Sequence, residues 1–181
     1  MESLAYVDHF LTELRDEIRP EVLGLACAGA GAWFGRKIQE HFGAQWLGRR
    51  EDPRSLRLFL TPVFVHLAPC DIALEVALGE SLEPDDPRIP PGPSFDASFN
   101  LDRRSTDSKP ESAAQWMSSR LSELRPLDEG LYFSLTGRLE TLELIAQMLA
   151  QRAQTEGLEP HDWTLADYLS ALSFEPGSGR N

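Results

Sequence analysis

Between positions 21 and 42 the chain reads EVLGLACAGAGAWFGRKIQEHF. Apolar residues recur there at helical spacing, but the centre of the segment, residues 26–32, has almost no side-chain bulk. Each glycine in a helix interior costs about 1 kcal/mol relative to alanine, so close packing must compensate for it. We therefore expect a central helix pressed against another part of its own chain. Close contact with a ligand, or with a second copy in a homodimer through 21–42, is the alternative.

A first amphipathic helix is predicted upstream of this segment, because five apolar residues follow one another at intervals of three and four: Leu4, Val7, Leu11, Leu14 and Ile18. Pro20 is expected to end that helix and to begin the next one at its first position. Gly43 is well placed as the C-cap of the second helix. The chain therefore opens with two helices.

The pattern changes from helix to strand after Gly43. Residues 45–49 and 55–60 are typical of strands, and Glu51-Asp52-Pro53 between them favours a turn, which predicts an antiparallel hairpin. Alternation predicts one buried and one wetter face of the sheet, with Leu56, Leu58 and Leu60 on one side and Arg57 and Phe59 on the other. Residues 63–67 predict a third strand, so the small sheet lies within Gln45–Leu67.

The second half of the chain is predicted to be mostly helical. A short helix starts at Pro69 and ends before Gly79, and three C-terminal helices begin near Ala113, Leu135 and Leu165, the last after a capping box of Thr164 with Asp167. Between them, residues 80–110 are rich in proline, aspartate and serine, which favours a mobile loop. The tail 175–181 is expected to fray. The whole predicts a single α+β domain in which helix exceeds strand.

Charge narrows the classes of partner. The 17 Lys and Arg residues against 29 Asp and Glu residues give a net charge of −12, which disfavours nucleic acid. The basic residues closest together, Arg49, Arg50, Arg54 and Arg57, are interrupted by acidic ones. Arginine is far commoner than lysine, which is typical of a GC-rich bacterial coding sequence. A basic protein is the partner class that this charge favours.

The sequence predicts a cytoplasmic protein that does not enter membranes. The N-terminus lacks the basic start and apolar run of a secretory signal. The longest uncharged apolar stretch, 22–35, is shorter than the about 18 residues that a membrane span requires. Cys27 and Cys70 lie far apart and suggest neither a disulfide framework nor a zinc ribbon.

No common catalytic or cofactor motif occurs in the sequence, and no cofactor is predicted. The most suggestive single position is Cys70, because the start of a helix lowers a thiol pKa and His66 lies four residues before it. The alternative is a purely structural role, in which Cys70 is half-buried and packs behind the hairpin. His9, His41 and His161 are scattered, and their spacing predicts no metal site.

Four aromatic residues form the predicted binding surface: Trp33, Trp46, Phe95 and Phe99. The two phenylalanines stand in the polar 80–110 segment, where they either pin it to the domain or act as a recognition element. We expect a non-enzymatic binding or accessory protein, of the immunity or adaptor type, that acts through an acidic surface. The alternative hypothesis is a thiol-dependent enzyme that uses Cys70 with His66.

Overall fold

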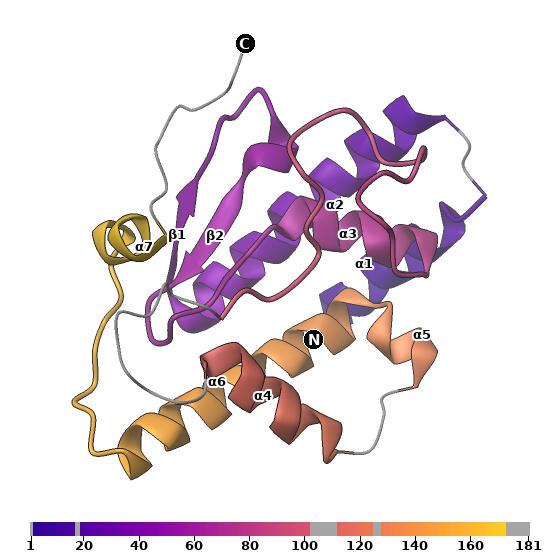
Figure 1. The fold of residues 1–181 in the computed structure, drawn as a ribbon. Helices are drawn as coiled ribbons and strands as arrows, with labels where there is room; N and C mark the ends of the chain where they lie inside the picture. Colours follow the sequence, from indigo (N-terminus) through magenta and orange to yellow (C-terminus); the bar gives the residue numbers. More distant parts are fainter. Residues whose placement is uncertain (1, 17–18, 102–111, 125–127, 173–181) are drawn as a thin grey trace.

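The computed structural model describes residues 2–16, 19–101, 112–124 and 128–172 (Figure 1). Over this part of the chain, helices surround a three-stranded antiparallel sheet, so the predicted α+β class with more helix than strand is confirmed. The predicted tail and positions 102–110 of the predicted loop lie outside the described residues.

Two helices open the chain, α1 (Glu2–Glu13) and α2 (Pro20–Phe42). The prediction that α1 runs to Pro20 is wrong, because the N–H groups of Leu14 and Arg15 bond carbonyls only three residues back and close a tight turn. Pro20 begins α2 as predicted, and Gly43 ends it with a φ of 74°. At that φ a side chain would be strained, which explains glycine at this position.

Helix α3 (Pro69–Leu78) is the most enclosed element, since each of its residues from Pro69 to Ala77 is buried. It packs against α1 and α2 and meets α6 (Leu135–Thr155). The low-bulk stretch of α2 explains how two helices approach so closely. A Cβ added at Gly31 would lie 2.6 Å from the Cα of Cys70, and one added at Gly35 would overlap the ring of Trp46. The expected packing of this helix on its own chain is confirmed.

The sheet has the order β1 (Ala44–Leu47), β2 (Arg57–Leu60) and β3 (His66–Leu67), with the short 3-10 helix η1 (Pro53–Ser55) between the first two strands. The predicted hairpin is confirmed, in the register that pairs Ala44 with Leu60. The third strand is shorter than predicted: before His66 the N–H of Val65 bonds the Val63 carbonyl at 2.8 Å and the Tyr168 hydroxyl at 2.9 Å, while its carbonyl still accepts from the N–H of Leu60.

The expectation of a wetter sheet face holds for Gln45, which is exposed, and Arg57, which is partly exposed, but it is wrong for Phe59. Leu58 and Leu60 enter the main core as expected, but Phe59 on the opposite face is only 1% exposed. Helix α7 (Leu165–Leu172) lies beside the sheet (Figure 1) and packs on that face, where Phe59 forms a second cluster with Phe64 and Tyr168. The Tyr168 hydroxyl also lies 2.8 Å from the Leu60 carbonyl, which ties α7 to the sheet.

The predicted C-terminal helices are α4 (Ala113–Ser122), α6 and α7, with a one-turn helix, α5 (Glu129–Tyr132), before α6. Asp8 of α1 binds the start of α6, since its carboxylate accepts hydrogen bonds from the backbone N–H groups of Leu135 at 2.5 Å and Thr136 at 3.2 Å. This contact fixes α6 against the N-terminal half of the chain and so places one wall of the site described next.

Candidate ligand cavity beside Arg138

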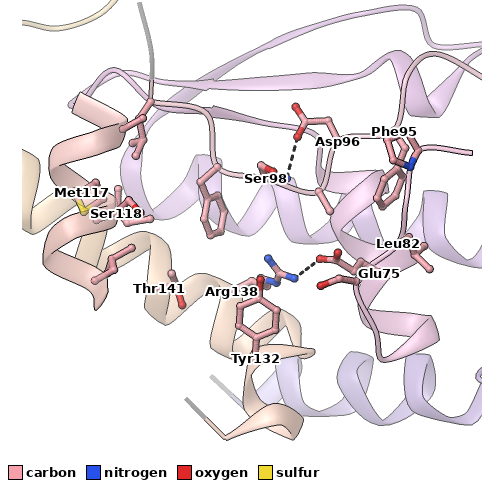
Figure 2. Close-up of a pocket in the computed structure, with 18 residues that line it drawn as sticks. Glu75, Leu82, Phe95, Asp96, Ser98, Met117, Ser118, Tyr132, Arg138 and Thr141 are labelled. Atoms are coloured by element: carbon pink, nitrogen blue, oxygen red, sulfur yellow. Dashed lines mark hydrogen bonds and ion pairs between the residues drawn. The ribbon is translucent and has the colours of Figure 1, made fainter. Parts of the chain in front are cut away.

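A cavity of about 730 Å³ lies among α3, α4, α6 and the irregular segment 81–101 (Figure 2). Its size is that of ordinary small-ligand sites, which are mostly apolar with a few polar groups. The apolar part of its wall comes from segment 81–101, α4 and α6 and includes Leu82, Phe95, Phe99, Met117, Leu121 and Ile145. The cavity therefore offers an apolar surface to an occupant.

A buried ion pair stands at the wall of this cavity. The Nη2 of Arg138, on α6, donates to the Oε2 of Glu75, on α3, and the two residues are 6% and 7% exposed (Figure 2). Burial raises the pKa of the Glu75 carboxyl, and the positive charge of Arg138 opposes that rise. The pair thus carries two opposite charges that compensate each other.

Some N–H donors of the Arg138 guanidinium have no acceptor among the described residues. Among the described residues only Nη2 has an acceptor, and Nε is fully buried without one. The ring of Tyr132 lies against the guanidinium, with its centre 4.4 Å from the Arg138 Cζ. Nη1 also has no acceptor among the described residues, and a donor left without a partner at a buried site costs about 1–3 kcal/mol, so the site favours an occupant that brings a hydrogen-bond acceptor to this nitrogen.

The opposite wall is held by a second buried ion pair. Arg54, at η1, donates from Nε to the Asp71 Oδ1 at 2.9 Å, and its other nitrogens reach the carbonyls of Pro90 at 2.5 Å and Pro93 at 2.9 Å. The other Asp71 oxygen accepts from the backbone N–H of Asp96 at 2.9 Å. These bonds fasten residues 90–96 to α3, directly beside Phe95. The mobility predicted for 80–110 stays a prediction.

The predicted binding residues separate into two groups. Phe95 and Phe99 both line the cavity, where they also pack against the main core. Trp33 and Trp46 do not line it. Trp46 instead covers Gly35 and donates from Nε1 to the Gln39 side chain at 3.3 Å. The ring of Trp33 faces the Lys37 ammonium, which lies 5.7 Å from the ring centre. The prediction had no signal for Glu75 or Arg138, which lie 63 residues apart in the sequence.

The structure places Cys70 in the first turn of α3, but its thiol is buried and lies 3.9 Å from the Ala28 carbonyl. Burial raises the Cys70 pKa to about 12, and the adjacent Asp71 carboxylate adds to the rise. Burial lowers the pKa of His66 to about 4. No hydrogen bond joins Cys70 to His66 in the part of the chain that is described; the imidazole stacks on Phe59, and its Nδ1 has no partner there.

Alkylation of the folded protein should therefore be slow at Cys70. A thiol pKa of about 12 leaves about a thousandfold less thiolate near neutral pH than the reference value of 9.0. Iodoacetamide labelling followed by mass spectrometry, as a function of pH, measures the rate, and urea-unfolded protein is the control. Rapid labelling of folded protein at neutral pH, with an apparent pKa near 9, would contradict the buried environment.

His66 should make the protein less stable as the pH falls. The folded-state pKa of about 4 lies below the reference of 6.5, so only the unfolded chain takes up this proton in between. Stability present above pH 6.5 is lost toward pH 4, by about 2 kcal/mol near pH 5. Urea unfolding at several pH values tests this. His66→Phe should flatten the dependence, and exposed His9→Gln should leave it unchanged; equal curves for His66→Phe and the parent would contradict it.

Among the described residues, no group of three or more histidine, cysteine or acidic side chains is arranged to hold a metal ion. None of the described helices combines the length and apolar composition needed to cross a bilayer.

Comparison with known proteins gives no relative for this chain. No protein-family model matches it, and no curated protein or solved structure matches it significantly.

Proposed function

We propose that this protein acts by binding a partner, as an accessory or adaptor-type protein, and that the cavity beside Arg138 is its recognition site. The observation that carries the proposal is the coincidence of an apolar wall with a guanidinium nitrogen, the Nη1 of Arg138, that has no acceptor among the described residues. An occupant with an apolar body and a hydrogen-bond acceptor would satisfy both. Such pockets, with few polar groups on a mostly apolar lining, are typical of recognition sites.

The way the site is held supports recognition by a preformed surface. Glu75 and Arg138 stand on two helices of the core, and Phe95 is fixed through the contacts of Arg54 and Asp71 with residues 90–96. Groups that are already ordered lose little conformational entropy when a ligand binds. The thiol-enzyme alternative has no comparable support, because a buried Cys70 with a pKa of about 12 is a poor nucleophile at neutral pH.

Nuclear magnetic resonance with capped amino-acid amides tests the site directly. N-acetylphenylalanine amide should shift the Arg138 Nε–H signal and the methyl signals of Leu82, Met117 and Ile145, in a saturable way, at millimolar concentration. Phe99→Ala should weaken this binding severalfold, while the matched control Phe10→Ala, which removes an exposed aromatic ring from α1, should not. Absence of saturable shifts at the lining residues would overturn the proposal.

Testing the hydrogen bonds from Arg138 requires a variant that removes the guanidinium and still folds. Removing one partner of a buried ion pair leaves an uncompensated charge, whereas replacing both by apolar residues of similar volume is often neutral. Glu75→Met/Arg138→Met should therefore fold with near-parent stability but bind the capped amide more weakly. Undiminished binding by a folded double variant would show that the acceptor site is not used.

A further inference from the structure

We propose that the occupant of the cavity is an apolar residue within a basic peptide segment of a partner protein. Its backbone carbonyl would accept from Arg138, its side chain would lie among Phe95, Phe99 and Met117, and flanking Lys or Arg side chains would meet Glu83 and Asp85. This inference rests on the proposed function and adds the chemistry of the partner.

The charge balance at the ion pair favours a neutral acceptor. Glu75 already compensates the single positive charge of Arg138, and both residues are buried. A carboxylate or phosphate entering beside them would bring a second negative charge into a site with one positive charge, at a large desolvation cost. A peptide carbonyl accepts the same hydrogen bonds without adding charge.

The charges at the edge of the cavity favour positively charged residues beside the peptide carbonyl that would bind Arg138. Segment 80–88 carries four carboxylates and one arginine, Arg88, which is engaged by Glu80 at 2.5 Å and by Asp86 at 2.6 Å. Glu83 and Asp85 are exposed, and no ion pair of theirs occurs among the described residues. They flank Pro84, which lines the cavity.

A basic segment satisfies these features together. A small neutral molecule would use the apolar wall and the Arg138 donors but leave the two carboxylates unused, and an anion would be repelled by them. The net charge of −12 also raises the rate at which a basic partner approaches, by long-range attraction that salt screens.

Three capped peptides test the inference on the full chain. In each, one phenylalanine is flanked by two lysines, two glutamines or two glutamates, and affinity is measured by calorimetry at low and high salt. The lysine peptide should bind about fivefold more tightly than the glutamine peptide at low salt, and high salt should remove the difference. The glutamate peptide should bind most weakly.

Two double variants localise the effect. Glu83→Gln/Asp85→Asn should abolish the preference for the lysine peptide over the glutamine peptide. Glu51→Gln/Glu159→Gln removes the same number of charges at exposed positions outside the cavity lining and should keep the preference. A preference that survives the first double variant would overturn the assignment of Glu83 and Asp85.

The failures of the two proposals can be told apart. Equal binding of the lysine and glutamine peptides, with lining residues still shifted, would overturn the basic partner and leave the recognition site intact. Equal binding of N-acetylphenylalanine amide and the lysine peptide would instead point to a small-molecule occupant. If no peptide perturbs the lining residues, the proposed function itself fails.

Discussion

Gly31→Ala should destabilise the folded protein by about 3 kcal/mol, which is the size expected for overpacking a tightly packed core. The new Cβ would lie 2.6 Å from the Cα of Cys70 and 2.7 Å from the Pro69 carbonyl oxygen. Both are backbone atoms at the start of α3, so no side chain can rotate away. Because α3 is buried along nearly its whole length, it cannot shift without disturbing its contacts with α1 and α6.

Gly29→Ala is the matched control in the same helix. A Cβ at Gly29 meets nothing within 4 Å in the structure. The substitution removes the conformational freedom of glycine in the unfolded chain and should stabilise the protein by up to about 1 kcal/mol. Both variants change the helix propensity of α2 equally, so their difference isolates the contact with α3.

Urea unfolding followed by circular dichroism measures both variants. We expect the midpoint to fall for Gly31→Ala and to rise slightly for Gly29→Ala, with the same dependence on urea concentration in each. If the two variants were equally stable, α2 and α3 would not approach as closely as described.

The parts of the fold that follow from local sequence were predictable. The spacing of apolar residues identifies α2 and α6, and Gly43 and Gly79 mark helix ends because each adopts a positive φ, 74° and 71°. The capping box before α7 is confirmed. The backbone N–H of Thr164 donates to the Asp167 carboxylate at 2.8 Å, and the backbone N–H of Asp167 donates to the Thr164 hydroxyl at 3.3 Å. These signals depend only on residues three or four apart.

The errors arise where distant parts of the chain meet. The alternation of residues in β2 places Phe59 on the face predicted to be wetter. However, α7, which starts more than a hundred positions later, covers it. Nothing in the strand itself indicates that cover. The α1 prediction failed for a related reason, since helical spacing continues to Ile18 while the backbone turns after Glu13.

The candidate site was half predictable. Phe95 and Phe99 attract attention because aromatic residues are unusual in a polar, proline-rich segment, and both line the cavity. Glu75 and Arg138 resemble ordinary charged residues of helices until the fold buries them together. Arg54 belongs to the interrupted basic run, where its neighbours do not distinguish it. Only the tertiary structure brings it to Asp71.

Asp71→Asn should destabilise the protein by about 3 kcal/mol, because it leaves the Arg54 charge buried without its counterion. The Arg54 and Asp71 side chains are 11% and 0% exposed, so water cannot replace the lost carboxylate. The contrasting pair is Arg49 with Asp52, whose side chains are 69% and 24% exposed. Asp52→Asn makes the same chemical change and should cost less than about 1 kcal/mol.

The local consequence of Asp71→Asn distinguishes the loss of this particular contact from general destabilisation. The Asp71 carboxylate accepts from the Asp96 N–H, so the amide of Asp96 should exchange with deuterium much faster in the variant. The amide of Tyr168, on the far side of the sheet, should respond only through the global stability. Because Phe95 and Asp96 line the cavity, the variant should also bind the capped amide more weakly at temperatures where it remains folded. Unchanged exchange at Asp96, with unchanged affinity, would contradict the role assigned to Arg54 and Asp71 in holding that wall.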